Sequence, residues 1–235
     1  MSNNFFRFKQ FTVYQDICAM KVGTDGTLLG AWASGGERIL DIGTGTGLIA
    51  LMMAQRFPNA NITAIDIDEK ACQQAEANFT DSPFAMRIST ICASLQDYEK
   101  SCKEETYDAI VCNPPFFVNS LLCPDDQRTT ARHASKLKYQ ELFHGVQRLL
   151  TDKGIFSAII PTNCLPDFEE AAYLCGLNRI KKCSIKTVPR KEAKRVLMSY
   201  SKSSEFEYYA SEESIDDGKG NRTKWYSDIT SEFYL

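Results

Sequence analysis

The residues best suited to chemistry form a tetrapeptide, Asn113-Pro114-Pro115-Phe116, directly after the apolar run at 109–112. Two consecutive prolines fix φ and remove two N–H donors, so this turn is stiff and exposes carbonyl groups. The Asn113 side-chain oxygen and a neighbouring carbonyl can then accept both hydrogens of one planar amino group. Such acceptors stabilise the positive charge on nitrogen as it attacks an electrophile, and Phe116 can stack on the ring. The tetrapeptide predicts catalysis at an amino nitrogen, with a plain strand-terminating turn as the alternative.

A glycine-rich turn, Asp41-Ile-Gly-Thr-Gly-Thr-Gly47, lies between a predicted strand and a predicted helix. Asp66 closes the next predicted strand, 23 residues after Gly43, where a carboxylate can accept hydrogen bonds from both hydroxyls of a ribose. Dinucleotide-binding turns follow the pattern G-x-G-x-x-G and lie against a pyrophosphate. Asp41 would repel a pyrophosphate but suits an ammonium or sulfonium group. The motif therefore favours a cofactor with a ribose and a cationic group, with NAD binding and a purely structural turn as alternatives.

Alternating strands and helices must position these two turns. Strands are predicted at 38–42, 61–65, 85–91, 107–112 and 154–160, and helices at 47–57, 69–79 and 139–150. This alternation predicts a doubly wound α/β fold with a mostly parallel sheet and helices on both faces. In such a sheet, ligands bind beyond the carboxyl ends of the strands, which places the tetrapeptide beside the glycine turn.

The chain is expected to form a single domain, 1–235, in three parts. Residues 1–36 are an N-terminal extension, which the resemblance described below places on the cofactor and substrate side, 37–175 the cofactor-binding and catalytic core, and 176–235 C-terminal strands, a basic segment and a tail. The polar stretch at 113–135 is too long for an ordinary connector and is either a functional loop or a disordered one.

Composition narrows the class of protein. Of 235 residues, 43% are hydrophobic and 24% charged, values that exclude wholesale disorder. No run approaches the about 18 apolar residues of a membrane span, and the N-terminus lacks a signal-peptide core, so we expect a soluble, cytoplasmic protein. Nine cysteines include no C-x-x-C pair and there are two histidines, so we expect reduced thiols and no metal site.

The net charge of −3 conceals a strongly basic segment. Residues 176–200 contain eight basic residues and one acidic residue, whereas 201–217 contain six acidic residues and one lysine. The basic segment predicts a phosphate-binding face, with a solvated pair of strands as the alternative. The candidates for RNA contacts are Lys191, Lys194 and Arg195, joined by Arg128 and Arg132 in the long polar stretch.

The two motifs together resemble class I S-adenosylmethionine-dependent methyltransferases, in the group that acts on amino nitrogens through Asn-Pro-Pro-Phe/Tyr. The N-terminal stretches at 6–13 and 20–32 further resemble the bacterial tRNA1(Val) (adenine(37)-N6)-methyltransferases, and the closing 232–235 matches weakly. The resemblance covers most of the chain. It implies a Rossmann-like sheet, S-adenosyl-L-methionine as cofactor, and tRNA as partner, methylated at N6 of adenine 37 in the anticodon loop, with no obligate protein partner.

The resemblance also implies site residues. The catalytic candidates are those of the tetrapeptide, and the cofactor-binding candidates are Asp41, Gly43, Thr44, Gly45, Gly47, Asp66, Ile67, Ser94, Asn113, Lys21 and Thr24. In the family, the segment before the first strand lies against the cofactor, so Asp25 is a further cofactor-side candidate beside Lys21 and Thr24. For Thr24, the alternative role is a helix N-cap. The family often has an acid near the adenine where this chain has Ser94, so either Ser94 or Asp97 could lie there.

Other functions with the same tetrapeptide stay open. An rRNA guanine-N2 methyltransferase usually brings a duplicated N-terminal domain, and a release-factor glutamine methyltransferase a helical one; 36 residues before the first strand leave no room for either. A cofactor-binding RNA module without catalysis is the third alternative, and an intact tetrapeptide argues against it.

Overall fold

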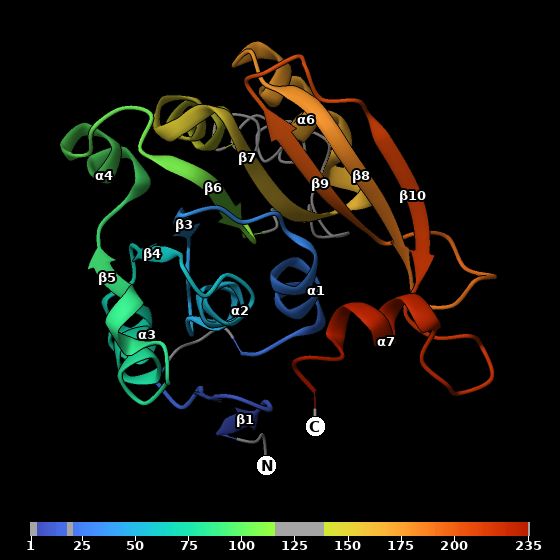
Figure 1. The fold of residues 1–235 in the computed structure, drawn as a ribbon. Helices are drawn as coiled ribbons and strands as arrows, with labels where there is room; N and C mark the ends of the chain where they lie inside the picture. The colour runs from blue at the N-terminus through green and yellow to red at the C-terminus, as the bar shows by residue number, and fades with distance from the viewer. Residues whose placement is uncertain (1–3, 18–20, 116–138, 235) are drawn as a thin grey trace, which may run out of the picture.

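An eight-stranded sheet organises the protein (Figure 1), whose computed structural model describes residues 4–17, 21–115 and 139–234. In spatial order its strands are β10 (Tyr209–Ser214), β8 (Asn178–Lys186), β9 (Arg195–Ser201), β7 (Leu150–Pro161), β6 (Tyr107–Cys112), β3 (Arg38–Ile42), β4 (Asn61–Asp66) and β5 (Ile88–Cys92). The five strands from β5 to β7 pair in parallel, β9 runs antiparallel to β7 and β8, and β10 adds to β8 in parallel. The mostly parallel sheet is confirmed.

Helices cover both faces of the sheet, as predicted. They are α1 (Thr24–Trp32), α2 (Leu48–Arg56), α3 (Glu69–Thr80), α4 (Leu95–Ser101), residues 139–149, α6 (Leu165–Leu174) and α7 (Lys224–Thr230). Figure 1 shows α1, α2, α3 and α7 on one side and α4 and α6 on the other. Successive strand residues feed opposite cores: Ile39 packs with the first group of helices and Leu40 with the second. The near-continuous apolar strands follow from burial on both faces.

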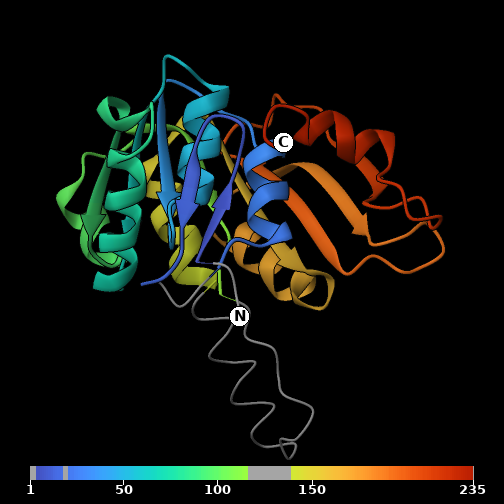
Figure 2. The ribbon, with the colours of Figure 1, turned by 90° about the horizontal axis from the view of Figure 1, so that it is seen from below.

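A small hairpin precedes this sheet and lies over its first helical layer. Strands β1 (Phe5–Arg7) and β2 (Thr12–Tyr14) pair antiparallel, and Figure 2 shows them in front of α2 and beside α3. The chain end closes on the hairpin, because the Lys9 backbone N–H donates to the Phe233 carbonyl at 2.9 Å. Phe8 is buried and stacks on Tyr234 at a centroid distance of 5.9 Å. The Phe8 side chain is therefore part of the hydrophobic core, whereas the Phe5 side chain is exposed.

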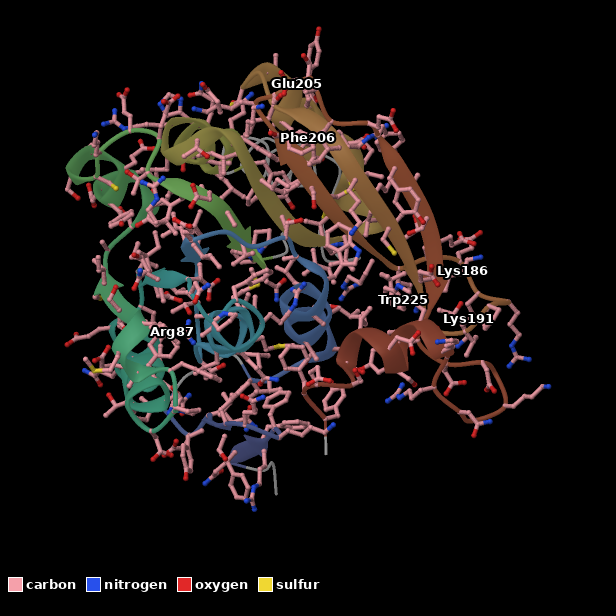
Figure 3. All side chains as sticks on the ribbon, viewed as in Figure 1. Arg87, Lys186, Lys191, Glu205, Phe206 and Trp225 are labelled. Carbon is pink, nitrogen blue, oxygen red and sulfur yellow. The ribbon has the colours of Figure 1, made fainter. Side chains whose placement is uncertain are left out.

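Several predicted boundaries differ from the structure; β7, for example, spans Leu150–Pro161 where a strand was predicted at 154–160. The strand predicted at 85–91 begins as a short 3-10 turn, η1 (Ala85–Arg87), before β5. The Arg87 guanidinium, labelled in Figure 3, holds this turn by donating to the carbonyls of Ala54, near the end of α2, and Ala60, directly before β4. The polar tail forms an edge strand and a helix, β10 and α7, that its composition did not predict.

Candidate active site

The structure brings the two predicted motifs to one edge of the sheet. β3 lies between β4 and β6, and its last residue, Ile42, is in register with Ile65 on one side and Cys112 on the other. The residues that follow these strands therefore meet at their carboxyl ends: the glycine turn after β3, Asp66 closing β4, and Asn113 after β6. This is the position at which open α/β sheets bind ligands.

The glycine turn adopts a backbone that side chains would disfavour. Gly43, Gly45 and Gly47 have φ of 70°, 57° and 81°. A Cβ on Gly47 would lie 2.4 Å from the Phe79 ring, so the close packing of α3 requires a glycine there. A Cβ on Gly43 or Gly45 would meet no atom within 4 Å, so the turn faces open space in which a ligand can approach its backbone.

Asp66 supports this turn from β4. Its Oδ2 accepts from the Gly45 N–H at 2.9 Å and its Oδ1 from the Asp68 N–H at 3.0 Å. Each carboxylate oxygen keeps a further lone pair, which fits acceptance from ribose hydroxyls. The next residue, Ile67, is 76% exposed, a large apolar side chain beside the carboxylate that offers a surface for a flat ring.

Asp41 lies buried beneath the turn. Its Oδ2 accepts from the Thr44 hydroxyl at 2.7 Å, while its Oδ1 has no hydrogen-bond partner among the described residues. Burial raises the pKa of Asp41 to about 7, and hydrogen bonds from the Thr44 side chain and the Ala50 backbone oppose this only in part. A buried carboxyl with an unsatisfied oxygen fits a cationic group supplied by a ligand.

Asn113 presents a second unsatisfied oxygen at the same edge. Its Oδ1 is buried and has no partner within the described part of the chain, and Pro114 beside it is buried. An acceptor held this way by a stiff Asn-Pro-Pro turn can take a hydrogen bond from an amino group. Phe116, Arg128 and Arg132 lie outside the described residues.

The remaining cofactor candidates lie at helix starts around this edge. Ser94 caps α4: its Oγ accepts from the Asp97 N–H at 3.1 Å and donates to Asp97 Oδ2 at 2.7 Å, which lowers the pKa of that carboxyl. The two candidates for an adenine contact are thus bonded to each other. Thr24 is the first residue of α1, whose N-cap is Gly23, and Lys21 is exposed before it.

The basic segment divides into neutralised strands and an exposed turn. On β8, Arg179 pairs with Glu169, and Lys186 pairs with Glu212 of β10 at 2.5 Å. Lys191 and Lys194 are exposed on the turn between β8 and β9, and Figure 3 places Lys186 and Lys191 near α7. Because β8 ends and β9 begins at the edge that carries Asn113, this turn lies on the side of the candidate active site.

Arg195 has a different environment from its neighbours on that turn. Its Nε donates to Asp25 Oδ2 at 2.7 Å, and the two side chains are only partly exposed. This ion pair joins the start of β9 to the first turn of α1. Two residues that the sequence analysis had assigned to different ligands, RNA and cofactor, therefore contact each other.

Sequence reasoning missed two buried amides of α3. Asn78 and Gln74 are buried, one helical turn apart, and both bind the backbone of the N-terminal segment. The signal was present: two polar residues fall on the face of α3 that carries Ala71, Ala75 and Phe79. Polar side chains on an apolar helical stripe indicate specific hydrogen bonds.

Strand order, the antiparallel β9 beside β7 and the glycine turn between β3 and α2 define a class I methyltransferase. Among solved structures, a predicted O-methyltransferase of Agrobacterium tumefaciens superposes with a TM-score of 0.72 at 18% identity, covering 89% of this chain and 96% of that one. TYW2 of P. horikoshii, solved in complex with MeSAdo, gives 0.58 at 15% identity, covering 86% of this chain and 73% of that one. These likenesses confirm the predicted fold.

The chain belongs to the methyltransferase small domain family, whose model matches residues 26–160, more than half of its length. A relative from Bacteroides fragilis (strain YCH46) is 50% identical over 202 residues, 85% of each chain. One from Bacteroides thetaiotaomicron is 46% identical over 239 residues, 100% of this chain and 99% of the relative. Both are named tRNA1(Val) (adenine(37)-N6)-methyltransferase, and this chain is a member of their family and an S-adenosylmethionine-dependent enzyme.

No helix of the described residues is long and apolar enough to cross a bilayer.

Proposed function

We propose that this protein methylates N6 of adenine 37 in the anticodon loop of tRNA1(Val), using S-adenosylmethionine. The observation that carries the proposal is the buried Asn113 Oδ1 without a partner among the described residues, one strand away from a glycine turn above Asp41, whose Oδ1 also lacks one. The relatives' shared name supplies the substrate, and their similarity over the whole chain supports the transfer.

The proposed cofactor site combines four features of the strand ends. Asp66 accepts from the ribose hydroxyls, Ile67 lies against the adenine, the ligand occupies the open space beside Gly43 and Gly45, and Asp41 neutralises its cationic end. When bound, S-adenosylmethionine supplies a methyl group on a positively charged sulfur. Ser94, Lys21 and Thr24 are proposed to border this site from the starts of α4 and α1.

Asn113 is the proposed catalytic residue. Its Oδ1 and the Pro114 carbonyl accept the two hydrogens of the N6 amino group and so orient the nitrogen lone pair toward the methyl carbon. The bound cofactor would supply an electrophilic methyl group, and attack by N6 would place a positive charge on that nitrogen. Both acceptors stabilise that charge until one N6 proton leaves to solvent. Phe116 is proposed to stack on the base, with Pro115 keeping the turn rigid.

Recognition of the tRNA is proposed to come from the exposed turn between β8 and β9. Lys191 and Lys194 lie on the active-site side of the sheet, where they can contact phosphates next to the target base. Arg195 is proposed to contribute alongside its ion pair with Asp25, and Arg128 and Arg132 from the long segment after Asn113. An anticodon loop is already single-stranded, so splaying out its adenine costs unstacking but little unpairing.

The organisation of the enzyme is also proposed. A single domain, 1–235, carries both the cofactor site and the RNA surface, and it works in the cytoplasm, where tRNA is modified, without an obligate protein partner. The extension at 1–36 and the C-terminal part at 176–235 complete the core of 37–175.

The test is methyl transfer to total tRNA from cells that lack this protein, followed by nucleoside analysis. We expect one N6-methyladenine per tRNA1(Val), located at position 37, and no product with Asn113→Ala protein. N2-methylguanine as the product, or no transfer to tRNA despite cofactor binding, would overturn the proposal in favour of one of its alternatives.

A further inference from the structure

Asn78 is a fully buried polar residue inside α3, with three hydrogen bonds that leave the helix. Its Oδ1 accepts from the Tyr14 N–H at 2.9 Å, and its Nδ2 donates to the Tyr14 carbonyl at 2.9 Å and to the Thr46 carbonyl at 2.8 Å. One acceptor and two donors are used, so only this orientation of the amide satisfies all three partners. Asparagine is a poorer helix former than alanine, so its place in α3 is explained by these bonds.

The three bonds join two segments far apart in the sequence. Tyr14 ends β2 of the N-terminal hairpin, whereas Thr46 belongs to the glycine turn. The first half of that turn is held from β4, because the Gly43 and Thr44 N–H groups donate to the Ile65 carbonyl. Its second half receives this side-chain bond from α3. Asn78 therefore connects the glycine turn to the hairpin.

Gln74 provides a natural comparison, one turn earlier on the same helix. It is also buried, and its Oε1 accepts from the Ile17 N–H at 2.8 Å. Both amides thus hold the N-terminal segment on α3. Within the described residues, Asn78 also bonds to the glycine turn, and Gln74 has no such bond.

We propose that Asn78 is a positioning residue for S-adenosylmethionine, which it affects through the glycine turn. By fixing the Thr46 carbonyl, it holds the second half of the turn in the orientation that the cofactor requires, and it makes this orientation depend on the docking of β2. The inference rests on the proposed cofactor site. Because Asn78 acts on binding and not on the attacking nitrogen, its loss should change cofactor affinity more than turnover.

The test compares Asn78→Ala with Gln74→Ala in the full-length protein, using calorimetry with S-adenosylmethionine and steady-state methyl transfer. We expect Asn78→Ala to raise the Kd and KM of the cofactor about 3- to 10-fold, the size expected for losing the one neutral hydrogen bond to the glycine turn, with kcat at saturating cofactor within about 2-fold. Gln74→Ala should leave the Kd within about 2-fold, since among the described residues it removes the bond to Ile17 and none to the glycine turn.

A second measurement needs no variant and serves if Asn78→Ala does not fold. In hydrogen exchange of the wild-type protein, S-adenosylmethionine should slow the Tyr14 N–H, which bonds to Asn78, more than the Ile17 N–H, which bonds to Gln74. The inference about Asn78, but not the proposed cofactor site, would be overturned by any of three results: wild-type cofactor affinity in Asn78→Ala, an equal loss of affinity in both variants, or no change in the exchange rate of the Tyr14 N–H on cofactor binding. Failure of the wild-type protein to bind the cofactor would overturn the proposed site as well.

Discussion

Asp41 Oδ1 and Asn113 Oδ1 are among the buried side-chain atoms that lack hydrogen-bond partners in the described part of the chain, and these two lie at the ends of neighbouring strands. Leaving a buried acceptor unpaired costs about 1–3 kcal/mol. A ligand that donates to both removes that cost. The cationic end of the cofactor and the substrate amino group are donors of the required kinds.

At Asn113, the expected effect of substitution is on the chemical step. Asn113→Ala removes an acceptor that stabilises the charge developing on nitrogen, so we expect turnover to fall by about 100-fold or more while cofactor affinity changes little. Single-turnover methyl transfer and calorimetry measure the two quantities separately. Asn113→Asp, which keeps an acceptor at the same position, should recover part of the rate. Near-wild-type turnover in Asn113→Ala would make the tetrapeptide purely structural.

At Asp41, the expected effect is on the pH dependence of cofactor binding. The pKa of this carboxyl is raised to about 7 by burial, so the free protein holds the proton below that pH and must release it to bind a cation. Affinity for S-adenosylmethionine should therefore fall as the pH drops from 8 to 6, by up to about tenfold per unit below 7. Calorimetry at three pH values measures this.

The raised pKa of Asp41 also makes the free energy of unfolding depend on pH. The folded pKa of Asp41 lies above the unfolded one, so the unliganded protein should lose stability as the pH rises from about 4 to about 7.

Asp41→Asn, which cannot ionise, should bind the cofactor more weakly and with no pH dependence between 6 and 8. A pH profile of binding that is identical in wild type and Asp41→Asn would contradict the assigned role.

Among the elements, β8 and β10 show why charge counted along the sequence differs from charge presented at the surface. The basic and acidic segments pair side by side as parallel strands, so Lys186 neutralises Glu212, and Arg179 is neutralised by Glu169 of α6. Surface ion pairs of this kind add little stability, but they remove charges from any RNA-binding face. The exposed Lys191 and Lys194, on the turn between β8 and β9, remain available to bind RNA.

For this turn, we expect the double substitution Lys191→Ala/Lys194→Ala to weaken tRNA binding and to reduce the slope of log Kd against log salt by about 1.4, or 0.7 for each lost single-strand phosphate contact. Cofactor affinity should stay unchanged. Lys103→Ala/Lys153→Ala is the matched control, because both lysines are exposed near the opposite ends of the strands. An unaltered slope would place the RNA surface on the segment with Arg128 and Arg132.

The elements also show how much of the fold and of the candidate site can be predicted from the sequence. The parallel core was predictable because strands buried on both faces are continuous apolar runs, and the glycine turn and Asn113 follow directly from strand ends. The Asp25–Arg195 ion pair was not, since it joins residues 170 positions apart and depends on β9 entering next to β7. Similarly, Asn78 has a local signal of burial, but its partners Tyr14 and Thr46 are set by tertiary packing.

On the scale of the whole molecule, the beginning and the end of the chain complete one hydrophobic core. Phe8 and Phe11 from the hairpin and Phe233 near the end belong to the same cluster as α1, α2 and the strands. The Lys9 ammonium adds a hydrogen bond to the Ser231 carbonyl. Because the N-terminal extension, the core and the C-terminal tail share this hydrophobic cluster, we expect them to unfold together.

Phe233→Ala tests this cooperativity. The Phe233 side chain is 1% exposed, so its removal should leave a cavity and cost about 3–5 kcal/mol of unfolding free energy. In urea unfolding, the fluorescence of Trp32 on α1 and Trp225 on α7 should change together with the far-UV circular dichroism, before and after the substitution. Tyr173→Ala, at a side chain that is 82% exposed, is the control and should shift stability by no more than about 0.5 kcal/mol. A loss below about 1 kcal/mol, or a fluorescence transition separate from the circular dichroism, would mean that the tail and hairpin form an independent unit, because only a shared core transmits the cavity to the whole fold.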